Sequence, residues 1–443
     1  MQRWLLVLLG ALALLLSSQA RAENAPKNII LVIGDGMGYP YLSAYRYFKD
    51  GRGETQQADM QPTLFDQYLV GAASTYPADS TLVTDSAAGA TTLASGIKTY
   101  NGAIGVDAER EPVTSMMEIA KNNGYLTAAV ATTRITHATP AAFFTHVESR
   151  RQEKEIARQY AEPRPDGQLK FDLLIGSGRR HFRFENDAGE RVDYLADLTR
   201  HGARVVESTE GLQSQYRLPV VALLHEDSFP YVIDDQPRLK TLTQEALRLI
   251  EADGRPYVLM IEASMIDWCG HARDIACAMH EVADLEAALE YLVAHVEGRD
   301  DTALVVTADH STGGFTMGAD GQYQFRAALL HEIQRSLYVM SRALTNMPRI
   351  DWDAYISHAI PYPLSTAQQA ELNRVASLTA TDKTDQIHEL LVNIVRFHTG
   401  SGFTTTGHTG EDVPVIAAGP WREAFRGQQD HSDIAKQLIE WIK

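Results

Sequence analysis

The chain has 443 residues, enough for one large domain or for two to three smaller ones, and its 44% hydrophobic and 22% charged residues are typical of a globular protein. The formal net charge of −17 predicts that there is no nucleic-acid-binding surface, because binding to a phosphate backbone needs a surplus of Lys and Arg. The same charge gives no diffuse attraction for anionic substrates, so a phosphate site would have to be built locally from a few cations and dipoles.

The N-terminus has the pattern of a cleavable secretory signal. Arg3 places a positive charge ahead of the apolar run Leu5–Leu16, which is too short for a membrane span, and Ala20–Ala22 fits the small-x-small cleavage rule. Residues 1–22 are therefore predicted to be a signal peptide, and the mature chain to be periplasmic or secreted. An uncleaved anchor is the alternative, but no stop-transfer pattern follows. No other segment reaches ~18 uninterrupted apolar residues, so no membrane span is expected in the mature chain.

Apolar, β-branched runs alternate with amphipathic stretches along the rest of the chain. The candidate strands are Asn28–Ile33, Leu126–Thr132, Phe171–Ile175, Tyr257–Ile261, Ala303–Thr307 and Val413–Ala417. The candidate helices are Ser86–Ser95, Val113–Asn122, Leu239–Ala252, Ile275–His295 and His431–Ile442. Continuous apolar strands that alternate with helices predict an α/β fold, with a mostly parallel central sheet covered by helices on both faces. Sites in such folds form at the carboxyl ends of the strands.

The stretch 318–402 interrupts this rhythm, with helical patterning at Phe325–Leu344, Thr366–Val375 and Asp382–Phe397. We interpret it as a largely helical insertion or subdomain within a single catalytic domain that spans 23–443. Such a segment could cover the entrance of a site or form an interface, and a homodimer is one assembly that the chain could form.

Asp, Glu and His residues, which are the types that can bind divalent cations, stand at the ends of these strands or just beyond them. They are Asp35, then Glu262, Asp267 and His271, then Asp309 and His310, and finally His408 ahead of the last strand. Each has an ordinary alternative, because Gly-Asp-Gly suits a turn, acidic residues suit a solvated loop or a helix cap, and loop histidines are usually exposed. Their joint occurrence favours a metal site, since one fold would bring all these strand ends to one edge.

Ser86 lies in Thr84-Asp85-Ser86-Ala87-Ala88-Gly89-Ala90, at the start of a predicted helix. A serine there meets free backbone N–H groups and the positive end of the helix dipole, which together bind anions. Asp85 or Ser86 could instead be only an N-cap. Because no Gly-x-Ser-x-Gly elbow surrounds Ser86, a metal is a better candidate than a histidine for its activation.

The chain has two cysteines, Cys269 and Cys277. An exported protein could pair them. If both lay on one helix, however, their eight-residue separation would place them ~12 Å apart, which is too far for a disulfide. We therefore expect them to be free.

With these motifs the sequence resembles the alkaline phosphatase family. The matching stretches are Ile33-Gly34-Asp35-Gly36-Met37-Gly38, Thr84-Asp85-Ser86-Ala87-Ala88, Thr139-Pro140-Ala141-Ala142, Glu262-Ala263-Ser264-Met265-Ile266-Asp267, Thr307-Ala308-Asp309-His310-Ser311-Thr312-Gly313-Gly314 and Gly407-His408-Thr409-Gly410. They follow the family's order and run from the first strand nearly to the C-terminus.

The resemblance implies hydrolysis of phosphate monoesters through a phosphoserine intermediate on Ser86, with Arg150 gripping the phosphate. It also implies two zinc ions and a third metal, usually magnesium. The implied ligands are Asp267, His271 and His408 for one zinc, Asp35, Asp309 and His310 for the second, and Asp35, Thr139 and Glu262 for the third metal. His137 stands two residues before Thr139, where some members carry Asp, and Trp268 follows Asp267, where some carry Lys. These two departures leave the identity and occupancy of the third metal open, as well as the strength of phosphate binding.

Two other readings of the motifs remain. One is a phosphodiesterase or a sulfatase on a similar core, although the C/S-x-P-x-R motif of sulfatases is absent around Ser86. The other is a non-catalytic metal- or phosphate-binding protein on the same scaffold, although every ligand position holds a competent residue.

Overall fold

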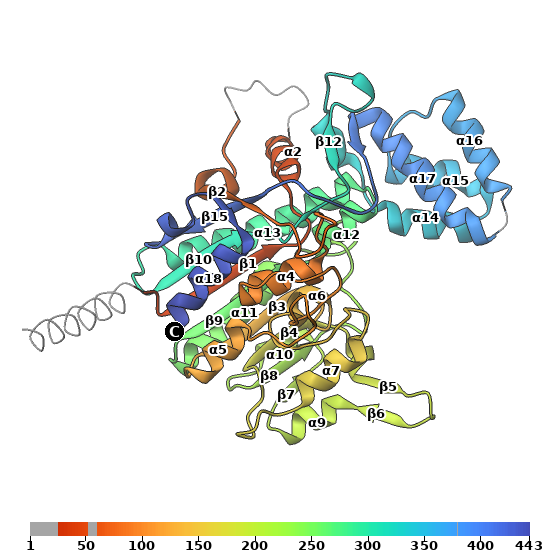
Figure 1. Ribbon diagram of the computed structural model, residues 1–443. Helices are drawn as coiled ribbons and strands as arrows, with labels where there is room; N and C mark the ends of the chain where they lie inside the picture. Colours follow the sequence, from red (N-terminus) through yellow and green to blue (C-terminus); the bar gives the residue numbers. More distant parts are fainter. Residues whose placement is uncertain (1–24, 52–59, 379) are drawn as a thin grey trace, which may run out of the picture.

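The computed structural model describes residues 25–51, 60–378 and 380–443 (Figure 1). The predicted signal peptide, residues 1–22, lies outside the described residues. Within those described ranges, no helix is both long and apolar enough to cross a membrane.

A ten-stranded sheet forms the core, in the order β16-β2-β15-β10-β1-β9-β3-β4-β8-β7. Its strands are β1 (Asn28–Gly34), β2 (Leu69–Ser74), β3 (Leu126–Arg134), β4 (Leu173–Ser177), β7 (Arg204–Val206), β8 (Val220–Leu223), β9 (Tyr257–Ala263), β10 (Thr302–Thr307), β15 (Val413–Ala418) and β16 (Gly427–Asp430). All neighbouring strands pair in parallel except β15, which is antiparallel to β10 and β2. The first residues of β15 therefore lie at the edge where β1, β9 and β10 end.

The predicted α/β class with a mostly parallel sheet is confirmed. Strands β1, β3, β9 and β10 are buried along their whole length, in keeping with their largely apolar sequences. All six predicted strands are present, with ends shifted by one or two residues. Sequence patterning missed β2, β7, β8 and β16, which lie toward the two sides of the sheet. Strands β7, β8 and β16 have only three or four residues, and β2 (Leu-Val-Gly-Ala-Ala-Ser) is mostly half-exposed and rich in small residues, so each leaves little pattern to detect.

Helices pack on this sheet in two groups (Figure 1). Helices α4 (Ser86–Ser95), α5 (Met116–Asn122) and α18 (His431–Ile442) pack together, and α11 (Leu239–Asp253) packs with α13 (Ile275–Val296). These are the five predicted helices. The start of α5 is later than the predicted Val113, because Ser115 forms a capping box with Glu118 and so fixes the first turn there.

The segment 318–402 leaves the core between β12 (Phe315–Met317) and β13 (Ser401–Phe403), which pair with each other. It holds α14 (Leu337–Asn346), α15 (Arg349–Ala359), α16 (Thr366–Ala376) and α17 (Ala380–Thr399), drawn in blue at one end of the molecule (Figure 1). Helix α15 was not predicted. Helix α14 starts later than the predicted Phe325, because Ser336 caps it through the N–H of Val339.

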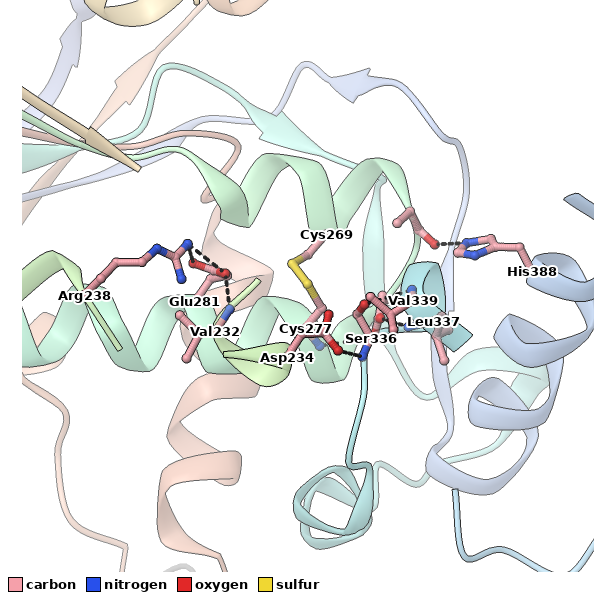
Figure 2. The surroundings of a disulfide bond; sticks show 12 residues. Val232, Asp234, Arg238, Cys269, Cys277, Glu281, Ser336, Leu337, Val339 and His388 are labelled. Atoms are coloured by element: carbon pink, nitrogen blue, oxygen red, sulfur yellow. Dashed lines mark hydrogen bonds and ion pairs between the residues drawn. A yellow bond between two sulfur atoms is a disulfide. The ribbon is translucent and has the colours of Figure 1, made fainter. Parts of the chain in front are cut away.

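The expectation of free cysteines is wrong, because Cys269 and Cys277 form a disulfide (Figure 2). The assumption of a single helix failed. Cys269 lies on α12 (Met265–His271), and Cys277 lies on α13, whose N-cap is Asp274. The turn between the two helices, with Arg273 at φ 54°, folds the chain back and brings the two Cα atoms to 5.6 Å.

Candidate active site

The predicted ligands gather at one edge of the sheet because of its topology. Asp35 follows β1, Glu262 stands near the end of β9, and Asp309 follows β10. His408 belongs to the two-residue strand β14 (His408–Thr409), which precedes the antiparallel β15. Residues from both ends of the chain therefore meet at the carboxyl ends of the parallel strands, as is usual for this class of sheet.

The first group consists of Asp267, His271 and His408, whose ligand atoms lie within 4.8 Å of one another. Asp267 lies within 3.3 Å of His271 Nε2 and 3.6 Å of His408 Nε2. The carbonyl oxygens of Thr406 and Thr84 lie 2.5 and 2.9 Å from Nδ1 of His271 and His408, respectively. A carbonyl in this position can accept the Nδ1 proton, which leaves Nε2 of each ring facing the shared space, as in a metal site.

The second group consists of Asp35, Asp309 and His310, all fully buried. Nε2 of His310 lies 3.4 Å from Asp35 and 3.3 Å from Asp309. The same nitrogen lies 3.1 Å from the hydroxyl oxygen of Ser86, which is 1% exposed. The predicted nucleophile therefore stands beside this group of ligands.

The third group consists of Asp35, His137 and Glu262. Thr139, predicted as a ligand of the third metal, is buried on the short helix α6 (Ala138–Ala141), which follows His137. Among the described residues, both oxygens of Asp35 and Glu262, the hydroxyl of Thr139 and Nδ1 of His137 are buried without a hydrogen-bond partner. Buried polar atoms are rarely left unpaired, so this set fits a bound cation.

The electrostatics of these groups also fit cations. Burial, followed by repulsion from neighbouring carboxylates, raises the pKa of Asp35 well above its usual value. Burial raises the pKa of Glu262 to about 8 and that of Asp309 to about 7. Burial together with His408 lowers the pKa of His310, which keeps its imidazole neutral. Carboxylates that repel one another and a neutral imidazole are the condition that a divalent cation would relieve.

Ser86 is the first residue of α4, and Asp85 is the N-cap, accepting the N–H of Ala88 at 3.0 Å. The capping role that was an alternative for Ser86 thus belongs to its neighbour. Ser86 is left free to face the ligand cluster from the N-terminus of a helix, where the backbone N–H groups and the helix dipole favour an anion.

The side chain of Arg150 points toward the start of α4, where Ser86 lies. Its guanidinium donates to Asp85 at 3.0 Å and lies 3.0 Å from Nε2 of His137. Burial disfavours the charged guanidinium, but attraction and a hydrogen bond to Asp85, together with attraction to Asp35 and Asp267, outweigh burial and raise the pKa of Arg150. The N-cap of α4 therefore also positions the predicted phosphate-binding arginine beside Ser86.

Trp268 lines the cleft that also contains Arg150, Asp267 and His271. Its indole ring is 6.0 Å from the ring of His137, and the guanidinium of Arg134 lies 5.5 Å from it. Trp268 therefore packs against His137, which itself contacts Arg150.

Sequence reasoning missed the residues that orient the ligands. Thr312 donates to Asp267 at 2.5 Å and lies 3.2 Å from Nδ1 of His310, which links the first two groups. The only available signal was its place in the Asp-His-Ser-Thr motif. Gly36, at φ 72°, is required because a Cβ there would lie 2.7 Å from Thr312 Oγ1 and 2.8 Å from Asp267 Cα.

A mostly parallel sheet with a buried serine amid three groups of side chains that could hold metal ions, all at its carboxyl edge, is typical of a metal-binding hydrolase. The comparisons with known proteins are more specific. The family model "Alkaline phosphatase" matches residues 26–443, and the chain belongs to the alkaline phosphatase family.

Individual relatives agree with this assignment. The chain is 38% identical to alkaline phosphatase 3 of Bacillus subtilis over 95% of its length and 90% of the relative's. It is 33% identical to the repressible alkaline phosphatase of Saccharomyces cerevisiae, over 89% of this chain and 76% of that one. The crystal structure of a cold-active alkaline phosphatase from a Shewanella species superposes with a TM-score of 0.84 at 36% identity, over 94% of this chain and 100% of that one. The protein is therefore an enzyme that hydrolyses phosphate monoesters and binds metal.

Proposed function

We propose that the enzyme acts through a phosphoserine intermediate on Ser86, with two zinc ions and a third metal, magnesium. The observation that carries the proposal is the 3.1 Å approach of the Ser86 hydroxyl to His310, a residue of the second ligand group. Ser86 Oγ attacks phosphorus and displaces the alcohol. Water then attacks the phosphoseryl group, which releases phosphate and regenerates the serine.

The two reaction steps need a site for the phosphoryl oxygens. The guanidinium of Arg150 would bind two of them in a fork, held in place by Asp85 and His137. The N-terminus of α4 would add backbone N–H groups and its dipole. Little of the alcohol is needed for this binding, so the phosphoryl group itself is the main recognition element.

The donor sets support particular ions. The first group, with one carboxylate and two imidazoles, and the second, with two carboxylates and one imidazole, suit zinc. When bound, these ions would lower the pKa of the serine hydroxyl and stabilise charge on the departing oxygen. Asp35, Glu262 and Thr139 offer oxygen and suit magnesium, whereas His137 adds a nitrogen donor. A solved alkaline phosphatase from the Antarctic bacterium TAB5 is described with magnesium in a site named M3 after a histidine was replaced by Asp.

We expect prolonged dialysis against a chelator to abolish hydrolysis of p-nitrophenyl phosphate, because buried carboxylates would be left repelling one another beside Ser86. Zinc added with magnesium should restore the activity. Elemental analysis of the purified enzyme should give two zinc ions per chain and one magnesium. An enzyme that keeps its activity after its metals have been shown to be absent would contradict the metal assignments.

We also propose that the protein is exported, as the pattern at residues 1–22 predicts. The disulfide between Cys269 and Cys277 supports this proposal, because such bonds persist in oxidising compartments. N-terminal sequencing of the mature protein should give a start near Glu23. A protein that retains Met1 and remains with the cytoplasmic fraction would show the proposal to be wrong.

A further inference from the structure

A cleft of about 570 Å³ opens from the ligand cluster, with the helical insertion as its far wall. Arg150 and Asp267 line it at the site, and Tyr338 and Arg342 of α14 and Asp385 of α17 line it opposite. This volume lies within the ~300–1,000 Å³ that is usual for pockets that hold a whole small molecule. The leaving group of a bound phosphate monoester would therefore meet the insertion.

The position of this wall relative to the ligands is fixed. The N–H of Leu337, at the start of α14, donates to Asp274 at 2.6 Å, and His388 of α17 lies 2.7 Å from the carbonyl oxygen of Ala272. Ala272 is the C-cap of α12 and Asp274 is the N-cap of α13, so both belong to the turn between the two helices that the disulfide joins. Because α12 carries two of the metal ligands, the turn ties the wall to the reacting centre.

Arg342 places a positive charge on this wall of the cleft. Its guanidinium lies 5.3 Å from the ring centre of Tyr338 and donates to the Tyr338 hydroxyl at 2.9 Å. Within the part of the chain that the structure describes, Arg342 forms no ion pair with a carboxylate. A guanidinium has five N–H donors, so most of those of Arg342 remain available to an anion in the cleft.

Asp385 lines the same cleft and has the opposite charge. It would repel an anion that Arg342 attracts. The wall therefore offers two side chains whose effects on an anionic leaving group should have opposite signs.

We propose that Arg342 is a specificity-determining residue, which binds a second anionic group on the leaving group of a phosphate monoester. The preferred substrates are then monoesters that also carry a distal phosphate or carboxylate. This inference rests on the proposed function, because it assigns the far end of the same site.

The test compares hexyl phosphate, 6-(phosphonooxy)hexanoate and hexane-1,6-diyl bisphosphate. All three release a primary alcohol of similar basicity, so differences in kcat/KM report recognition and not leaving-group chemistry. The kcat/KM measured for the bisphosphate is divided by two before the comparison, because either of its two ends can react. The ratio of each charged substrate to hexyl phosphate is measured for the wild-type enzyme and the variants, all loaded with metal.

In Arg342→Gln the ratio should fall roughly three- to ten-fold, mainly through KM, as expected for loss of an exposed charge-assisted contact. Asp385→Asn should raise it. Arg374→Gln removes the same charge from α16, outside the cleft, and should leave the ratio unchanged. If only the ratio for the bisphosphate falls, Arg342 selects a distal phosphate. If the ratio for the carboxylate substrate falls as well, Arg342 binds either kind of anion.

The inference is overturned if the ratio is unchanged in Arg342→Gln, or if Arg374→Gln lowers it equally. Failure of the underlying function would look different, because the wild-type enzyme would then not hydrolyse hexyl phosphate at all.

Discussion

Replacement of Ser86 by Ala should lower kcat/KM for p-nitrophenyl phosphate by at least about a thousand-fold, because the variant lacks the atom that accepts the phosphoryl group. The side chain is 1% exposed and packs at the start of α4, whose cap is the neighbouring Asp85. Loss of one hydroxyl should therefore leave the helix and the metal ligands in place. The metal content of the variant should equal that of the wild-type enzyme.

The covalent step can be observed separately. Acid quenching of the wild-type enzyme with labelled phosphate should leave label on the peptide that contains Ser86, and the variant should retain none. Ser95→Ala is the matched control, because Ser95 ends the same helix and its hydroxyl donates only to nearby backbone oxygens such as that of Thr91. Wild-type rates in Ser86→Ala would exclude the phosphoserine route.

The sequence predicted which side chains gather at the site better than it predicted the chain direction and backbone contacts around them, and the reason is physical. A buried parallel strand must be continuously apolar, so its end is visible in the sequence, and the ligands stand at those ends. The antiparallel direction of β15 was not visible, yet it is what brings His408 to the same edge. The roles of Thr84 and Thr406 were also hidden, because each uses a backbone carbonyl that any residue would supply.

The disulfide is a feature that the sequence analysis did not predict. The distance estimate for Cys269 and Cys277 was sound for one helix, but the chain turns at Arg273, a residue with φ 54°. Only a few per cent of residues other than glycine adopt such a conformation, so sequence patterning had no reason to place a turn there. The contacts of Asp274 with both α13 and α14 reinforce that turn.

Asp35→Asn should have the second-largest effect, because Asp35 is shared by two of the three ligand groups. An amide offers a neutral oxygen in place of an anionic one, so both ions should bind more weakly. Loss of a residue that only supports a metal ligand typically costs about 10- to 100-fold, so we expect this loss of a direct ligand to lower kcat/KM by at least about a hundred-fold. Elemental analysis should show fewer ions per chain. Asp300→Asn is the control, because Asp300 is exposed near the opposite end of β10.

The same substitution should act in the opposite direction on the stability of the metal-free protein. Burial and the nearby Asp309, Asp267 and Glu262 raise the pKa of Asp35, so the folded state disfavours its charged form. That penalty is absent below the usual carboxyl pKa and grows as the pH rises through the folded-state pKa. An amide carries no charge and can donate to the unpaired oxygens of Glu262 and Asp309.

At pH 8 the metal-free Asp35→Asn variant should therefore be more stable than the metal-free wild-type protein, with a free energy of unfolding higher by on the order of 1–3 kcal/mol. It should accordingly unfold at a higher temperature. With metals restored the order should reverse, because the cations bind the wild-type carboxylate more tightly than the amide and so stabilise the wild-type protein more. Scanning calorimetry of both proteins, with and without metals, measures all four values. If the variant is less stable in both states, Asp35 is held by packing and not by charge, and the electrostatic case for the metal cluster fails at one of its fully buried residues.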